Sequence, residues 1–271
     1  MSVCMQDKIV VVIQARMTSS RLPGKVLMPV LGKSLLMRMI ERVKRTTYPI
    51  TVVIATSTDK SDDVIEDEAK RNDIACYRGS LDNLLERHYE AAQLHNADLV
   101  IKIPSDCPLI DAKVIDKTID VYYKHGRIYD YVSNLHPATY PDGNDVEIMT
   151  MDCLKRAQEM AKNPWELEHT TPVIWEHPEH FNIGNHIWQT GFDCSMTHRF
   201  TIDYIEDYAF ILKVFEMLYP VKPHFSCNDI LQLLEEHPEI YQLNEKYIGV
   251  NWYRNHLSDL KTVSAGQTKL I

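Results

Sequence analysis

Three cationic side chains follow the first apolar run of the sequence. Residues 8–14 read KIVVVIQ, and Arg16, Arg21 and Lys25 lie in the loop of mostly small residues that comes next. A guanidinium group binds phosphate oxygens with a planar fork, and an ammonium group adds a mobile point charge. The loop therefore favours binding of a highly charged anion such as a triphosphate, although Arg16 alone would be typical of an ordinary solvated loop.

This loop does not follow the glycine-rich patterns that bind phosphates through backbone amides. G-x-G-x-x-G is absent. Gly32, Lys33 and Ser34 spell the end of a Walker A motif, but the chain has Leu27 where that motif needs its earlier glycine. In this loop, side-chain cations must then bind the phosphates that backbone amides bind in those folds.

Two aspartates follow other strand-like runs. Asp106 lies in IKIPSDCPLID and Asp203 ends RFTID. Mg²⁺ takes one or two protein carboxylates and completes its shell with water and substrate phosphates, so both are candidate ligands. A turn hydrogen bond is the plainer interpretation of Asp106. Glu206 and Asp207 begin the next helix, where we expect them only to complement its dipole.

An acidic turn and one histidine complete the candidate residues. Within YPDGNDVEIM (140–149), a PDG turn explains Asp142, which leaves Asp145 and Glu147 as candidates to bind hydroxyl or amine groups of an organic substrate. His169 in ELEHTTP is a further candidate, but no nucleophile accompanies it. The sequence therefore shows no Ser/His/Asp arrangement.

Composition limits the partners. The net charge of −9 argues against nucleic acid, which needs a basic stripe. No apolar run approaches the ~20 residues that span a bilayer, and no signal peptide precedes the first run, so we expect a cytoplasmic protein without a membrane partner. The six cysteines fit reduced thiols because none forms a C-x-x-C pair; they are Cys4, Cys76, Cys107, Cys153, Cys194 and Cys227.

The elements that must position these residues alternate between strand and helix. Short β-branched runs predict buried strands, and amphipathic stretches between them predict helices. Such a series predicts an α/β fold with a mostly parallel, doubly wound sheet, which binds ligands beyond the carboxyl ends of its strands. The first-half strands are 8–14, 50–56, 74–79 and 98–103, and the helices are 34–45 and 82–95.

The second half is less regular. We expect residues 1–271 to form a single domain, in which 258–271 is a loose tail. The further strands predicted are 129–134, 145–150, 180–185 and 198–203, and the closing helices are 205–218 and 226–237.

Several motifs together resemble the cytidylyltransferases that activate sugar acids, such as acylneuraminate and Kdo, and most closely the spore-coat polysaccharide biosynthesis branch. They follow the family's order over roughly residues 8–240, which is more specific than any single motif. They are VVIQARMTSSRLPGKVL, RGSLDNLLERHYEAA, IKIPSDCPLID, SNLHPATYPDGNDVEIM, EHTTPVIWEHPEHF and TIDYIEDY.

This resemblance implies a nucleotidyltransferase fold of the glycosyltransferase A type that uses CTP and Mg²⁺. It assigns catalysis to Arg16, Lys25 and Asp106, and places the segment from Asp82 to Arg87 at the border of the pockets. The residues implied to bind the nucleotide are Gln14, Ala15, Arg16, Arg21, Lys25, Asp82 and Asp106.

The resemblance also implies the metal and acceptor sites. Asp106 would hold Mg²⁺ with Asp203 as the second ligand, while Asp145, Glu147 and His169 would meet a phosphorylated or acidic acceptor. Transfer of CMP with release of pyrophosphate would serve surface polysaccharide or capsule synthesis. A homodimer is expected, with Trp188, Phe192 and Phe200 at its interface or in the core.

Two other functions compete with this interpretation. A nucleotide-sugar glycosyltransferase commonly holds its metal with D-x-D, which is absent from the chain. A non-catalytic nucleotide-binding protein would be expected to lose the charges of its site, whereas Arg16, Lys25 and Asp106 are all present.

Overall fold

The chain folds around a seven-stranded sheet with the order β5-β4-β1-β6-β8-β7-β9. The computed structural model describes residues 7–270, so Cys4 lies outside it. Neighbouring strands pair in parallel except at β8, which is antiparallel to both β6 and β7. The predicted mostly parallel α/β sheet is therefore confirmed. The strands are β1 (Ile9–Gln14), β4 (Ile50–Ser57), β5 (Ala75–Gly79), β6 (Leu99–Lys102), β7 (Tyr131–Ser133), β8 (Glu147–Thr150) and β9 (Ile183–Asn185), with a separate pair β2 (Pro29–Val30) and β3 (Lys33–Ser34).

One predicted strand is wrong. Residues 198–203 form only an isolated bridge between Arg199 and Asp142. The backbone N–H of Phe200 donates to the carbonyl oxygen of Asp142 (2.7 Å), and the N–H of Ile202 donates to that of Asp106 (2.9 Å). The segment thus bonds to two different loops instead of joining the edge of the sheet, and this ties three parts of the candidate site together.

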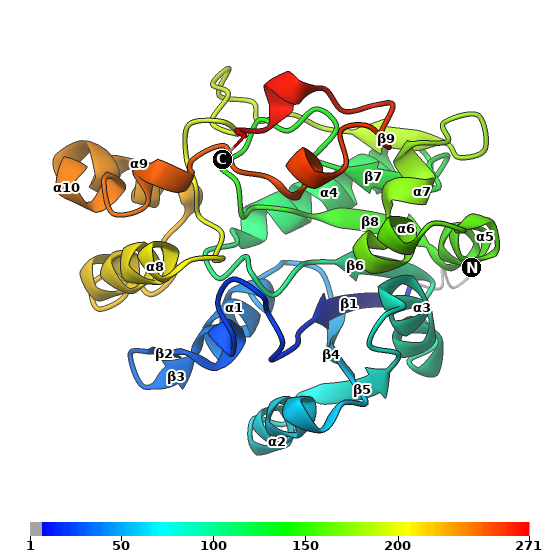
Figure 1. Cartoon of the computed structure of the whole chain (residues 1–271), viewed down its shortest axis with the longest axis horizontal. Coiled ribbons are helices and arrows are strands. Elements are labelled where there is room, and N and C mark those ends of the chain that lie inside the picture. Colours follow the sequence, from blue (N-terminus) through cyan, green and yellow to red (C-terminus); the bar gives the residue numbers. More distant parts are fainter. Residues whose placement is uncertain (1–6, 271) are drawn as a thin grey trace, which may run out of the picture.

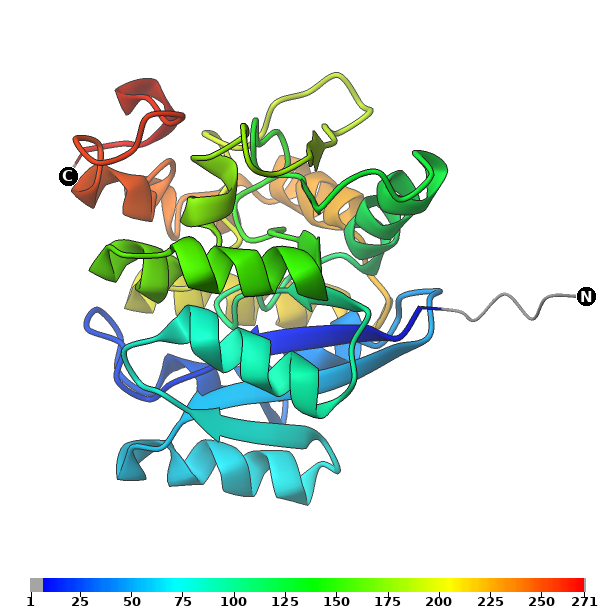
Figure 2. The ribbon, with the colours of Figure 1, turned by 90° about the vertical axis from the view of Figure 1, so that its right-hand side faces the viewer.

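Helices cover both faces of the sheet because alternate side chains of β1 point in opposite directions. Val11 and Ile13 belong to a core shared with α1 and α4, whereas Val10 and Val12 pack in a core with α3 and α5. Figure 2 shows α3 and α5 lying side by side across one face. The helices are α1 (Leu35–Val43), α2 (Asp63–Arg71), α3 (Leu84–Leu94), α4 (Ala112–Lys124), α5 (Met151–Met160), α6 (Pro164–His169), α7 (Pro172–Trp175), α8 (Ile205–Leu218), α9 (Cys227–Glu236) and α10 (Pro238–Tyr241).

A third core lies beside the sheet, where α8, α9 and α10 gather at one end of the molecule (Figure 1). Phe210, Phe215 and Ile230 of this group are buried against Leu35 and Phe200. The group is continuous in sequence with the segment that carries Asp203. Its packing therefore fixes that segment against the sheet.

The C-terminal segment is packed rather than loose. Leu260 and Val263 are buried in the core that contains α5 and α7. The buried Glu176 carboxylate accepts hydrogen bonds from the backbone N–H groups of Lys261 (2.7 Å) and Thr262 (2.9 Å). The sequence shows little of this because the anchoring carboxylate lies far away along the chain.

Candidate active site

A cleft of about 1150 Å³ opens beyond the carboxyl ends of β1, β5 and β6. One side is formed by the loop after β1, and another by residues 134–147. The segment from Val250 to His256 and the pair Gly266 and Gln267 form a further wall. Figure 2 shows the loop after β1 (blue) and this C-terminal segment (red) on the same side of the molecule. The cleft therefore lies where a doubly wound sheet binds ligands.

Lys25 lies between the two predicted metal ligands. Its Nζ donates to the carbonyl oxygen of Ile202 (2.6 Å) and to Asp203 Oδ1 (3.0 Å), and it lies 3.5 Å from Asp106 Oδ2. Asp106 keeps a third of its side chain exposed, whereas the Lys25 and Asp203 side chains are 10% exposed. Burial alone would raise the pKa of Asp203, but Lys25, Arg21 and Arg199 lower it. The structure thus brings together a lysine and two carboxylates that are far apart in sequence.

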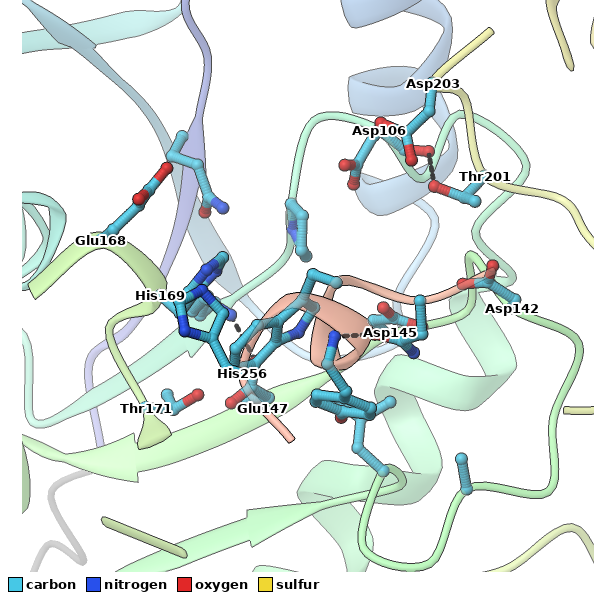
Figure 3. Close-up of a pocket in the computed structure, with 18 of the residues that line it drawn as sticks. Asp106, Asp142, Asp145, Glu147, Glu168, His169, Thr171, Thr201, Asp203 and His256 are labelled. Atoms are coloured by element: carbon cyan, nitrogen blue, oxygen red, sulfur yellow. Dashed lines mark hydrogen bonds and ion pairs between the residues drawn. The ribbon is translucent and has the colours of Figure 1, made fainter. Parts of the chain in front are cut away.

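The two predicted arginines of the loop lie at different places. Arg21 Nη2 donates to Asp203 Oδ1 (2.8 Å), which places it beside Lys25. Arg16 Nη2 instead lies 3.4 Å from Glu168 Oε1, and both of these side chains are about half exposed. Figure 3 shows Glu168 across the cleft from Asp106 and Asp203. Such an exposed pair stabilises little, so Arg16 is available to a ligand.

A buried carboxylate that the sequence analysis missed holds the loop in place. Asp62 is fully buried, and its Oδ1 accepts a hydrogen bond from the backbone N–H of Met17 (2.7 Å). Its Oδ2 accepts from the N–H (3.2 Å) and hydroxyl (2.5 Å) of Ser57 at the end of β4. Further along, Gly24 has φ +72° and donates to the Met17 carbonyl (2.9 Å), which closes the turn before Lys25.

Arg199 is a further site residue that the sequence analysis missed. Only 1% of its side chain is exposed, and it pairs with Asp142 (3.1 Å), Asp203 (3.1 Å) and Asp207 (2.9 Å). Burial alone would lower the pKa of Arg199, but Asp142 and Asp207 raise it. The expectation that Asp207 serves only the helix dipole is therefore incomplete: its carboxylate also accepts from the backbone N–H of Asp203 (2.9 Å). No sequence signal linked these residues before the fold was known.

The acidic turn has one carboxylate that is not committed to an ion pair. Asp142 pairs with Arg199. Glu147 is buried, accepts from Lys102 Nζ, and accepts from the Tyr131 hydroxyl (2.8 Å). Asp145 Oδ1 accepts only a long bond from the N–H of Gly143 (3.4 Å) among the described residues. Burial, and then the nearby Asp106, raises the pKa of Asp145 to about 7.

His169 forms part of an aromatic wall. Its ring stacks on Trp252 with centroids 3.8 Å apart, and Trp175 lies 6.4 Å from the same indole. Burial lowers the pKa of His169 to about 3, so the imidazole is neutral near pH 7. Figure 3 shows His169 and His256 on the same side of the cleft. A neutral imidazole can donate one hydrogen bond to an uncharged group of a ligand and accept another from a hydroxyl or amine.

The remaining residues that were predicted to bind the nucleotide also line the cleft. Gln14 ends β1 and Ala15 follows it, and Asp82 precedes α3. Asp82 is exposed at the cleft, and the buried Arg87 lines it from α3. These residues therefore face the same space as the cations of the loop.

The sequence matches the cytidylyltransferase family over residues 10–250. The chain belongs to this family. Its reaction class, nucleotidyl transfer from CTP, fits a cleft that combines loop cations with two carboxylates. The motif resemblance and the nucleotidyltransferase fold are thus confirmed.

Known relatives agree with this assignment. The cytidylyltransferase is 29% identical over 240 residues to the spore coat polysaccharide biosynthesis protein SpsF of Bacillus subtilis, covering 86% of this chain and 96% of that protein. A cytidylyltransferase structure from Leptospira borgpetersenii superposes with a TM-score of 0.82 at 32% identity, covering 88% of this chain and 98% of that one. The structure of CMP:2-keto-3-deoxy-manno-octonic acid synthetase complexed with CTP matches with a TM-score of 0.61 at 16% identity, over 77% of this chain and 98% of that chain, and shows the shared fold.

Two further findings concern membrane-spanning helices and metal-binding groups. Within residues 7–270, no helix is both long and apolar enough to cross a bilayer. The same residues contain no group of three or more His, Cys, Asp or Glu side chains arranged for a metal ion. A metal at Asp106 and Asp203 would complete its shell with water and substrate phosphates, as Mg²⁺ usually does.

Proposed function

We propose that this cytidylyltransferase joins CMP from CTP to a small phosphorylated or acidic metabolite or sugar and releases pyrophosphate. The observation that carries the proposal is Lys25, held within 3.5 Å of both Asp106 and Asp203 at the end of the sheet. Arg21 adds a second cation there, and Arg16 faces the cleft with only an exposed partner. Positive charge next to carboxylates suits a nucleotide triphosphate that brings its own metal.

The reaction follows from charge and alignment. An acceptor oxygen attacks the α-phosphorus of CTP and forms a new P–O bond, while the bond from the α-phosphorus to the bridging oxygen breaks and its electrons leave with pyrophosphate. An acceptor phosphate or carboxylate is already ionised at neutral pH, so no general base is needed. Arg16, Arg21 and Lys25 would bind the triphosphate and stabilise the charge of the departing pyrophosphate.

Mg²⁺ fits the carboxylates of the cleft. Asp106 has one side-chain ion-pair partner, Lys25 at 3.5 Å, and is partly exposed, so it can take a metal without breaking a buried network. Asp203 is the proposed second ligand, although its oxygens already accept from Arg21, Lys25 and Arg199. When bound there, the ion would neutralise charge on the α-phosphate.

The acceptor would lie against the acidic turn and the aromatic wall. We propose that Asp145 and His169 contact its hydroxyl or amine groups, since neither is committed to an ion pair. Glu147 would act on acceptor binding indirectly, by positioning Lys102, because its own carboxylate already accepts hydrogen bonds from Lys102 and Tyr131. The name of the Bacillus relative supports a role in surface polysaccharide or capsule synthesis.

We also propose that the enzyme is a cytoplasmic homodimer. Of the three aromatic residues considered for the interface, Phe200 is fully buried and Trp188 stacks on Tyr140 (5.4 Å). Phe192 is 71% exposed and Ile187 is 54% exposed on the same loop, which supports a contact there. Sedimentation of the wild type beside Phe192→Ser tests this: a dimer that the substitution dissociates supports it, and a wild-type monomer contradicts it.

The experiment that tests the reaction is pyrophosphate release with Mg²⁺. CTP, UTP, ATP and GTP should each be tried against phosphorylated sugars, polyols and amino-acid derivatives and against free sugar acids. Release with CTP and one acceptor class would support the proposal and name the substrate. Transfer from a nucleotide sugar without pyrophosphate would contradict it.

A further inference from the structure

One buried cation of the cleft differs from the others. Lys25, Lys102 and Arg199 are buried, and each pairs with at least one carboxylate. Arg87 is only 1% exposed and lines the same cleft. Among the described residues, no carboxylate lies within ion-pair distance (4.0 Å) of its guanidinium. A buried charge without a partner is costly, so this arrangement points to a partner supplied by the ligand.

The hydrogen bonds of Arg87 are also incomplete. Nη1 donates to the carbonyl oxygen of Ser80 (3.1 Å), and the buried Nε has no partner within residues 7–270. Arg42, which is buried outside the cleft, instead donates three hydrogen bonds to backbone carbonyls and lies over the ring of Phe225. Arg42 leaves only Nη1 without a partner among the described residues and is held by protein atoms, whereas Arg87 makes a single hydrogen bond to the protein and lines the cleft.

A neighbouring amide is fixed by His88, the next residue of α3. His88 Nδ1 lies 2.8 Å from the carbonyl oxygen of Leu84, so this nitrogen must carry the proton and donate. Burial lowers the pKa of His88 to about 3, and its neutral ring can then only accept at Nε2, which lies 3.1 Å from Gln14 Oε1. Two acceptors cannot bond, so we assign the Gln14 NH₂ group to that contact by exchanging the amide oxygen and nitrogen, which turns Oε1 away from His88.

The surroundings suit a planar ring. Leu81 and Leu84 are partly exposed and line the cleft beside Arg87 and Gln14. Apolar side chains can cover the faces of a ring while polar groups meet its edge. The triphosphate cations Arg21 and Lys25 are grouped at Asp203 instead.

Resting on the proposed function, we propose that Arg87 and Gln14 select cytosine. The Arg87 guanidinium donates to O2 and N3 of the base, and Gln14 Oε1 accepts from its 4-amino group. Uracil presents an N–H at position 3 and an oxygen at position 4, so it would place a donor against Arg87 and an acceptor against Gln14.

The test is calorimetric binding of CTP, UTP and inorganic tripolyphosphate to the full chain with Mg²⁺ and without acceptor. Arg87→Met should weaken CTP about 10- to 100-fold and leave tripolyphosphate and UTP nearly unchanged. Arg16→Met is the matched control, because loss of a phosphate contact should weaken all three. Gln14→Met, at a less buried position, should lower the CTP preference as well if Arg87→Met fails to fold.

The possible outcomes distinguish a failure of this inference from a failure of the proposed function. A wild type that prefers CTP, with an Arg87→Met variant that keeps the same CTP-to-UTP ratio, would overturn this inference alone. Equal weakening of CTP, UTP and tripolyphosphate by Arg87→Met would also overturn it, because Arg87 would then contact phosphate. A wild type that does not bind CTP at all would overturn the proposed function and this inference with it.

Discussion

At the scale of single residues, cationic side chains of the cleft pair with carboxylates. Lys25 and Arg21 share Asp203, and Arg199 holds the same carboxylate from the buried side. This network keeps the cations close together without a ligand, although like charges repel. A triphosphate with its metal would take over part of this pairing, so the residues are positioned before the substrate arrives.

Replacement of Lys25 tests this arrangement. Lys25→Met should lower kcat about 100- to 1000-fold, since one preorganised donor to the leaving group is lost. Folding should persist because Asp203 keeps Arg21 and Arg199. Pyrophosphate release measures the first effect and thermal unfolding the second. Near-normal kcat in a folded variant would contradict the role given to Lys25.

A partly buried histidine predicts how stability depends on pH. His169 has a folded pKa of about 3, below the ordinary value of 6.5, so the unfolded chain binds a proton between these values and the folded chain does not. The free energy of unfolding should therefore decrease as pH falls below 6.5. His169→Phe keeps the ring on Trp252 and should flatten this slope by about 1.4 kcal/mol per pH unit.

Urea unfolding of both proteins from pH 7.5 to 4 measures this slope. The difference in the free energy of unfolding between the two proteins at pH 7.5 gives the part of the substitution's cost that does not depend on protonation. Parallel stability curves for the two proteins would show that His169 titrates normally in the fold.

At the scale of elements, the acidic turn lies directly on the segment that carries Asp203. Gly143 has φ +98°, and a Cβ there would stand 2.6 Å from backbone atoms of Phe200 and Thr201. Backbone cannot move aside as a side-chain tip can. Glycine is therefore required by this close approach, which also brings Asp142 to Arg199.

Gly143→Ala should thus destabilise the protein by about 2–4 kcal/mol, through steric overlap and the strained backbone, and should reduce activity. Gly191→Ala is the matched control, because Gly191 has φ +81° but a Cβ there would meet no atom within 4 Å. It should cost only about 1–2 kcal/mol. Equal losses for both variants in urea unfolding would contradict the close-approach argument.

The C-terminal segment should act on the acceptor and not on the nucleotide. Glu176 anchors it through Lys261 and Thr262, and Trp252 of the same chain end stacks on His169. Glu176→Ala should therefore raise KM for the acceptor several-fold with little change in KM for CTP. Steady-state kinetics that vary each substrate in turn give both values. An equal rise in the two KM values would instead indicate a general loss of structure.

At the scale of the whole molecule, the sequence predicted the parts whose signals are local. Apolar runs located β1, β4, β5 and β6, and the loop cations stood out by their spacing after residues 8–14. The links between distant segments were not visible: Arg199 and Asp62 are buried charges whose partners are known only from the fold. The strand predicted at 198–203 was wrong because its β-branched and aromatic residues pack between loops and α8 rather than in a sheet.

The protein is acidic overall, but several of its cationic side chains line the cleft. Its net charge is −9, yet Arg16, Arg21, Lys25 and Arg87 all line one cleft. Eight acidic side chains line the same cleft beside its eight basic ones, so a small anion would be bound by direct contacts with these cations and not by a net positive field. The overall charge and the cleft therefore agree with a nucleotide substrate rather than a nucleic acid.

We propose that this cleft binds CTP with a metal at Asp106, and calorimetry of CTP with and without Mg²⁺ tests this proposal. The wild type should bind CTP more tightly with Mg²⁺, and Asp106→Asn should lose that gain while remaining folded. Asp193→Asn, a change at another cleft aspartate, should keep it. CTP affinity that is the same with and without Mg²⁺, and unchanged in Asp106→Asn, would show that Asp106 holds no metal for CTP binding.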